Sequence, residues 1–97
     1  NIFIINKGRL ATPLLDQCGV AGVMRRIILE KIAGQMGLKI EQKQIDVRAL
    51  LESDEVFLSN SVRGVWPVNC VGERYFGVGD ITAQVVEQVE LIWGEKV

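Results

Sequence analysis

Residues 2–5, Ile-Phe-Ile-Ile, form an unbroken apolar run that limits what the chain can fold into. Successive side chains of a strand point to opposite faces, so this unbroken apolar run predicts a strand that is buried on both sides. A chain of 97 residues typically buries only about 60–65% of its unfolded surface. The sequence opens on this strand with no initiator Met and no polar leader, so we expect a piece of a larger protein or a chain that depends on a partner.

Turn and helix signals follow the apolar run. Asn6-Lys7-Gly8 is typical of a tight turn, and residues 9–11 are predicted to return as a second hairpin arm that Thr12-Pro13 ends. From about Ala21-Gly22, apolar side chains recur every three or four positions, which predicts an amphipathic helix. Its apolar face comprises Met24, Ile28, Ile32 and Met36, with Val23 and Ile27 beside them. Gly37 is the expected end of this helix, because Gly adopts the left-handed conformation easily.

The second half of the chain alternates short elements with turn residues. A half-exposed strand is predicted at residues 38–45, and Asp46 is expected to cap a short helix at residues 47–52. Strands are predicted at residues 55–59, 68–71 and 74–76, with a connection at residues 60–67. A last helix is predicted at residues 80–93, and Asp80 is expected to cap it. The order β-β-α-β-α-β-β-β-α predicts a mixed α/β fold rather than a doubly wound parallel sheet.

Composition excludes several classes of function. Eleven basic and twelve acidic side chains give a net charge of −1, which argues against nucleic-acid and membrane surfaces as partners. The chain has no His, which excludes Ser-His-Asp and Cys-His catalysis and His-ligated metal sites from these residues. Cys18 and Cys70 form no CxxC pair, so free thiols are expected.

Two segments place small polar residues beside the ends of expected elements. Cys18-Gly19-Val20-Ala21-Gly22-Val23-Met24-Arg25 leads into the first helix, where free backbone amides suit an anion such as phosphate. The alternative is an ordinary tight helix start, because the segment is neither a GxGxxG nor a Walker pattern. Leu58-Ser59-Asn60-Ser61-Val62 ends an apolar strand, where its side chains could contact a ligand in a crevice or simply serve turn chemistry.

Other polar and aromatic residues have structural explanations. Arg25 and Arg26 are expected on a solvated helix face, although one of them could pair with a carboxylate or a phosphate. Asp54 and Glu55 are neighbours in a strand and point to opposite sides, so a shared acid–base pair is not expected. The two tryptophans, Trp66 and Trp93, are expected to pack in the core or at an interface.

Four phrases together resemble the fold-type IV enzymes that use pyridoxal phosphate, the class IV aminotransferase family. In chain order, these phrases are Asn1-Ile2-Phe3-Ile4-Ile5 with Gly8, Ala11-Thr12-Pro13, Gly19 to Arg25, and Asp54 to Ser61 with Pro67-Val68. The resemblance covers about residues 1–71 and implies the mixed-sheet C-terminal domain of that family. Residues 1–97 would then be a partial domain that binds the cofactor phosphate.

The resemblance also implies roles for individual residues. The cofactor would be pyridoxal 5′-phosphate, held by Gly22, Val23, Met24, Asn60 and Ser61, and the substrate would contact Ser61, Val62 and Arg63. In the family, the lysine that bonds the cofactor lies before the first phrase, and none of the five lysines here lies in a matching context. No catalytic residue and no metal ligand is therefore expected in this chain, which alone would be inactive.

Within the family, three features resemble the aminodeoxychorismate lyases more than the aminotransferases. They are Met24 where aminotransferases usually carry Thr, the pair Asn60-Ser61, and the sequel at residues 62–67. The expectation is a cytoplasmic homodimer that acts on a small molecule, aminodeoxychorismate, in folate biosynthesis. A branched-chain or D-amino-acid aminotransferase is the first alternative, and an inert fragment that only packs or dimerises is the second.

Overall fold

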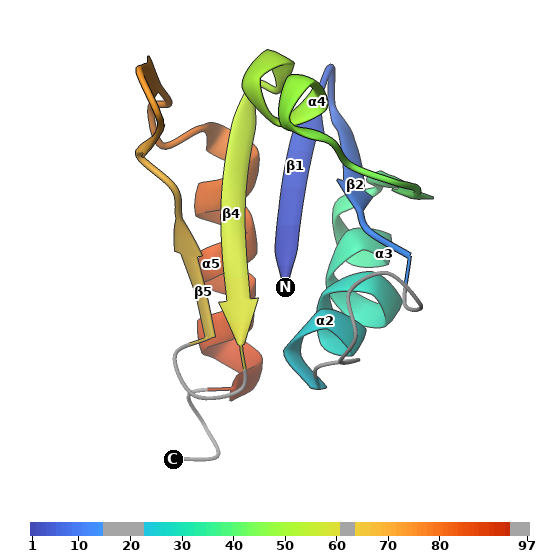
Figure 1. The fold of residues 1–97 in the computed structure, drawn as a ribbon. Helices are drawn as coiled ribbons and strands as arrows, with labels where there is room; N and C mark the ends of the chain where they lie inside the picture. Colours follow the sequence, from blue (N-terminus) through green and yellow to red (C-terminus); the bar gives the residue numbers. More distant parts are fainter. Residues whose placement is uncertain (15–22, 61–63, 94–97) are drawn as a thin grey trace.

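The computed structural model describes residues 1–14, 23–60 and 64–93, and its centre is a five-stranded mixed sheet (Figure 1). The strand order is β3-β2-β1-β4-β5. All neighbours are antiparallel except β2 and β3, which run parallel. The strands are β1 Ile2–Asn6, β2 Arg9–Thr12, β3 Lys39–Gln42, β4 Glu55–Asn60 and β5 Gly64–Pro67. The predicted mixed α/β class is confirmed.

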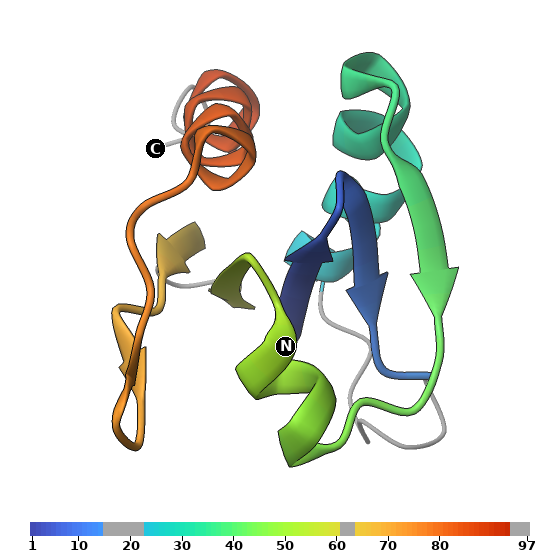
Figure 2. The same ribbon diagram turned by 90° about the horizontal axis from the view of Figure 1, so that it is seen from above.

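Helices cover both faces of this sheet (Figure 2). On one face lie α5, Asp80–Trp93, and a continuous helical segment made of α2, Val23–Ile27, a π-helical turn, Ile28–Ile32, and α3, Ala33–Met36. The opposite face carries α4, Val47–Glu52. A small hairpin of β6, Cys70–Val71, and β7, Arg74–Tyr75, follows β5.

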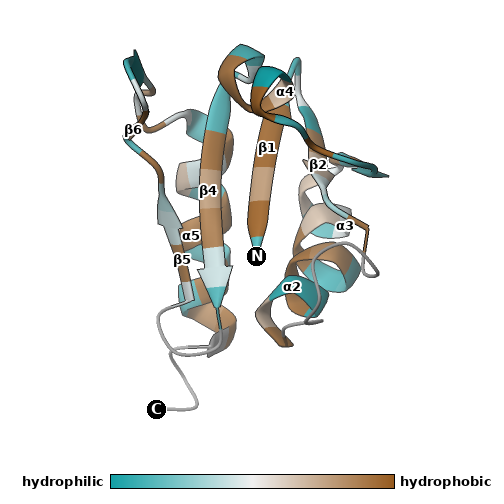
Figure 3. Ribbon diagram, in the orientation of Figure 1, coloured by the Kyte–Doolittle hydropathy of each residue, from teal (hydrophilic) through white to brown (hydrophobic). Residues whose placement is uncertain are grey.

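Phe3, Ile4 and Ile5 of the opening apolar run are buried, as predicted, and Ile2 is partly buried. Figure 3 shows β1 largely in the brown of hydrophobic residues. Phe3 and Ile5 belong to the cluster under α2 and α5, whereas Ile4 belongs to the cluster on the α4 side. The rings of Phe3 and Phe57 stack with centroids 4.9 Å apart, which ties β1 to β4 at the centre of the larger cluster. The core therefore lies where the two central strands meet the helices.

The predicted apolar face of the first helix is also confirmed. Met24, Ile28 and Ile32 are fully buried in the larger cluster, and Met36 packs partly buried against it. Gly37 ends the segment in the left-handed conformation, with φ of 69°. Asp46 caps α4 as expected, because its carboxylate accepts from the Ala49 amide at 2.8 Å.

Three predictions about the second half were wrong in part. Residues 60–67 do not form only a connection, because β4 extends to Asn60 and residues 64–67 return as edge strand β5. Gly64 and Pro67 are typical of a turn, but an edge strand tolerates Pro because the position of the missing N–H can face away from the neighbouring strand. The predicted strands at 38–45 and 68–71 are shorter, at residues 39–42 and 70–71.

The hairpin turn offers a test of local backbone strain. Lys7 and Gly8 both have positive φ, 52° and 78°, as in the type I′ turn that favours Asn-Gly. A Lys in the left-handed region costs roughly 1 kcal/mol. We therefore expect Lys7→Asn to raise the free energy of unfolding by about 0.5–1 kcal/mol, measured by chemical denaturation. The matched control Lys7→Ala should change it by less than about 0.5 kcal/mol. An Asn variant no more stable than the Ala variant would contradict the strain argument.

Candidate functional site

The described parts of the two candidate segments belong to the start of α2 and the end of β4, which lie at one edge of the sheet (Figure 1). β1 begins there and β4 ends there, since the amino group of Asn1 donates to the Ser59 carbonyl at 2.8 Å and the Ser59 amide donates to the Asn1 carbonyl at 2.9 Å. Helix α2 packs against β4. The described start of the helix, at Val23, and the end of the strand, at Asn60, are thus brought to the same side of the molecule.

The start of α2 has the features of an anion site. The first amides of a helix have no acceptor within the helix and lie at the positive end of its dipole. Val23 is exposed, whereas the side chain of Met24 is fully buried in the core. Met24 can therefore serve an anion at this edge only through its backbone amide.

Arg25 corrects the expectation of a solvated face. Its side chain is buried, with 4% of the residue exposed. Its Nη2 atom donates to the Pro13 carbonyl at 2.7 Å and to Gln42 Oε1 at 3.2 Å, which links α2 to the ends of β2 and β3. Arg26 does lie on the solvated face, where it pairs with Glu30 at 3.4 Å.

The burial of Arg25 had a signal in the sequence that the helix-stripe argument missed. Arg25 lies three residues before Ile28 and seven before Ile32, so it shares a face with these two core residues. A cation at such a position is buried unless its side chain reaches past the apolar stripe. Its acceptors come from other strands, and the helical pattern alone could not supply them.

Buried polar atoms without partners also mark this region. Among the described residues, Ser59 Oγ and Arg25 Nε are buried and form no hydrogen bond; the same holds for Thr82 Oγ1, beside the opposite end of β4. Ser59 lies two residues after Phe57, so both side chains face the helices α2 and α5. Buried polar groups normally have partners. The Ser59 hydroxyl and the Arg25 Nε–H group can both donate, and a phosphate dianion offers acceptors, so they are compatible with a bound phosphate.

The other predicted site residues divide into two groups. Asn60 is the exposed last residue of β4 and pairs across the ladder with Gly64 of β5. Four predicted residues lie outside the described part of the chain: Gly22, Ser61, Val62 and Arg63. The structure therefore brings Val23, Met24 and Asn60 to one edge.

The predicted separation of Asp54 and Glu55 is confirmed. Asp54 Oδ2 accepts from the Lys7 amide at 2.8 Å, at the β1–β2 turn. Glu55 Oε1 accepts from the Thr82 amide at 2.7 Å, at the start of α5. The two carboxylates therefore serve different elements and form no acid–base pair.

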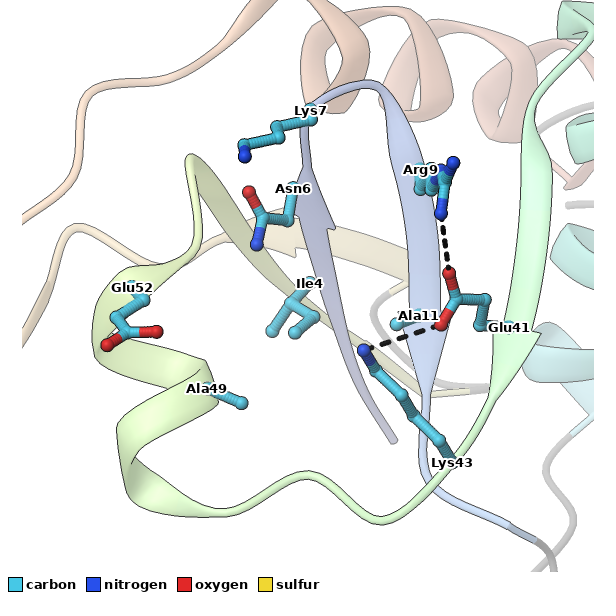
Figure 4. A pocket seen from close by; sticks show the side chains of 9 residues that line it. All are labelled: Ile4, Asn6, Lys7, Arg9, Ala11, Glu41, Lys43, Ala49 and Glu52. Carbon is cyan, nitrogen blue, oxygen red and sulfur yellow. Dashed lines mark hydrogen bonds and ion pairs between the residues drawn. The ribbon is translucent and has the colours of Figure 1, made fainter.

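A separate pocket of about 530 Å³ lies on the other face, between strands β1 to β3 and α4 (Figure 4). Its lining combines apolar and charged side chains: Ile4, Asn6, Lys7, Arg9, Ala11, Glu41, Lys43, Ala49 and Glu52. Glu41 pairs with Arg9 at 3.5 Å and with Lys43 at 3.4 Å, so its charge is already compensated. None of the described residues predicted for the phosphate site, Val23, Met24 and Asn60, lines this pocket.

The chain is thus an α/β protein with a candidate phosphate site at one edge of its sheet. Sequence comparison shows the family to which it belongs. The chain belongs to the class IV aminotransferase family, which matches residues 1–71. A probable branched-chain-amino-acid aminotransferase of Thermotoga maritima is 33% identical over 93 residues. An aminodeoxychorismate lyase of Vibrio harveyi is 39% identical over 89 residues. The alignments cover 93% and 88% of this chain but 34% and 32% of these relatives, so the chain spans about a third of their length.

Solved structures agree with this family. A 4-amino-4-deoxychorismate lyase from Pseudomonas aeruginosa superposes with a TM-score of 0.86 at 38% identity, over 93% of this chain and 33% of that one. A branched-chain aminotransferase from Thermoproteus uzoniensis gives a TM-score of 0.90 at 29% identity, over 99% of this chain and 32% of that one. The predicted family and its fold-type IV architecture are confirmed.

Two searches of the described residues found nothing. No helix in the described ranges is long and apolar enough to cross a membrane. Nor do three or more acidic or Cys side chains gather into a possible metal site within the same ranges.

Proposed function

We propose that the chain is part of a pyridoxal-phosphate-dependent 4-amino-4-deoxychorismate lyase and that the edge between α2 and β4 holds the phosphate of the cofactor. The observation that carries this proposal is the packing of α2 on β4, with the start of the helix and the end of the strand on the same side of the molecule. Membership of the class IV aminotransferase family supports the cofactor. Residues 1–97 then form a partial C-terminal domain of the complete protein.

The residues at this edge fit a phosphate monoester. The backbone amides of Val23 and Met24 would donate to the phosphate oxygens, and the positive end of the helix dipole would favour the negative charge. Asn60 and Ser61 would contribute from the end of β4, and Gly22 would add no side chain to hinder the phosphate. Since the Met24 side chain is buried in the core, its replacement of a threonine leaves the backbone donors unchanged.

The chemistry comes from the cofactor, which acts as an electron sink for the bonds around the carbon that carries the substrate amine. The role of this chain is to hold the phosphate end and to form one wall of the substrate pocket. We assign Ser61, Val62 and Arg63 to that wall, with the amides of the first two near a substrate carboxylate. The lysine and the carboxylate that complete the site are supplied by other parts of the complete protein, which we propose is a cytoplasmic homodimer in folate biosynthesis.

Two observations bear on the choice between lyase and aminotransferase. Sequence identity is higher to the Vibrio harveyi lyase, at 39%, than to the Thermotoga maritima aminotransferase, at 33%. Met24 and the pair Asn60-Ser61 also depart from the pattern that the aminotransferases usually carry. A branched-chain aminotransferase is the second candidate, favoured by the longer alignment to the Thermotoga maritima relative, 93 residues against 89.

The complete protein that carries this sequence provides the test. Incubated with pyridoxal 5′-phosphate and aminodeoxychorismate, it should release pyruvate and 4-aminobenzoate with no keto acid added. Aminobenzoate fluorescence follows one product, and lactate dehydrogenase with NADH follows the other. Amino-group transfer from a branched-chain amino acid to 2-oxoglutarate, without aminobenzoate release, would contradict the lyase and support the aminotransferase. Failure to bind the cofactor at all would contradict both and favour an inert packing unit.

A further inference from the structure

The charge of Arg25 is not compensated by any acidic group that the structure describes. Its two acceptors, the Pro13 carbonyl and the Gln42 amide oxygen, are neutral. The ion pairs among the described residues involve Arg9, Arg26, Lys43 and Arg48 as cations. A guanidinium stays protonated in proteins, and burying a charge without a counter-ion is costly. Among the described residues, which leave out Asp16, the buried guanidinium therefore has no acidic partner, and an anion close to it would be stabilising.

Arg25 also fixes the geometry of the helix start. β2 and β3 run parallel and pair Thr12 with Gln42, and the Lys43 amide donates to the Thr12 carbonyl at 3.1 Å. Arg25 bonds to both strands just where this pairing ends, at Pro13 and Gln42. Because residues 23–25 share one helical turn, this link holds the amides of the first turn in a set direction.

We propose that Arg25 is a positioning residue for the phosphate site: it clamps the start of α2 to β2 and β3, and its positive charge raises the affinity for a phosphate dianion. This inference rests on the proposed function and deepens it. The guanidinium acts through the backbone that it holds and through its electrostatic field, and needs no contact with the cofactor. Its Nε atom is buried and has no hydrogen-bond partner among the described residues.

The test compares two ligands that differ only in the phosphate, pyridoxal 5′-phosphate and pyridoxal. Their affinities for the protein are measured by absorbance titration for the parent sequence and for Arg25→Gln. We expect Arg25→Gln to lower the affinity for pyridoxal 5′-phosphate by about ten- to a hundredfold. The substitution removes a positive charge that lies several ångströms from the phosphate in a partly desolvated site. The affinity for pyridoxal should fall by less than about twofold, because this ligand lacks the phosphate charge that the guanidinium attracts.

Three variants make the result specific. Arg26→Gln removes an exposed arginine from the next position and should leave both affinities unchanged. Arg25→Lys keeps the charge without the planar fork and should recover part of the phosphate preference. Gln42→Ala removes one acceptor at an exposed residue and keeps the charge, so it remains informative if Arg25→Gln does not fold. It should reduce the phosphate preference by a few-fold.

The outcomes separate this inference from the proposed function. If Arg25→Gln or Gln42→Ala lowers the melting temperature but leaves the ratio of the two affinities unchanged, Arg25 is structural only and the inference is wrong. If the parent protein itself shows no preference for the phosphorylated ligand, the phosphate site and the inference both fail. A preference in the parent that is lost in Arg25→Gln and partly kept in Arg25→Lys supports both.

Discussion

Replacing Phe57 with alanine is expected to lower the free energy of unfolding by about 3–5 kcal/mol, a large part of the stability of a domain this size. Phe57 is fully buried at the centre of the larger cluster and stacks on Phe3, with the two rings only 9° from parallel. The substitution removes the buried ring and its stacking on Phe3, and leaves a cavity between β1, β4 and the helices. Urea denaturation followed by circular dichroism measures the change.

Two controls sharpen this prediction. Tyr75→Ala removes an aromatic ring that is 75% exposed, and it should change the stability by less than about 0.5 kcal/mol. Phe57→Leu keeps most of the apolar volume and should cost less than about half as much as the alanine variant. An alanine variant as stable as Tyr75→Ala would mean that the two central strands do not carry the core.

Replacing Gly79 with alanine is expected to cost about 2–3 kcal/mol. A Cβ atom at this position would lie 2.0 Å from the Cδ atom of Glu55. Glu55 is buried, and its carboxylate accepts from the Thr82 amide at the start of α5. The added methyl group would push this carboxylate off the helix start and leave a buried charge without its donor. Thermal unfolding of the variant measures the loss.

The cause can be separated from a general glycine effect. Gly77 has nothing within 4 Å of an added Cβ, so Gly77→Ala should be nearly neutral. In a Glu55→Ala background the obstructing carboxylate is gone, and Gly79→Ala should then cost less than about 1 kcal/mol. Full additivity of the two substitutions would show that Gly79 and Glu55 do not interact.

Elements with a strong local pattern were predictable from the sequence. The apolar face formed by Met24, Ile28 and Ile32, the turn at Lys7-Gly8 and the Asp46 cap all depend on residues within a few positions of one another. Strand β5 was missed because its sequence resembles a turn and its pairing with β4 decides its conformation. Local sequence carried no information on that pairing.

Contacts between residues far apart in the sequence could not be predicted, for the same reason. Asp80 was expected to cap the last helix, and α5 does begin there, but the Thr82 amide is accepted by Glu55, which lies 27 positions earlier. Arg25 was placed in solvent because its acceptors lie on β2 and β3. For the candidate site, the helix-start argument selected Val23 and Met24 from the residues alone, whereas the link to residues 60–63 needed the family resemblance.

The central claim is that the start of α2 and the end of β4 bind one phosphate group. The most direct measurement is a titration of the ¹⁵N-labelled protein with pyridoxal 5′-phosphate, followed by the backbone amide resonances, with pyridoxal as the reference ligand. The amides of Val23, Met24 and Ser61 should shift with the phosphorylated ligand and far less with pyridoxal. Shifts confined to Lys7, Arg9 and Lys43 around the pocket on the α4 side, with the amides of Val23 and Met24 unmoved, would contradict the claim.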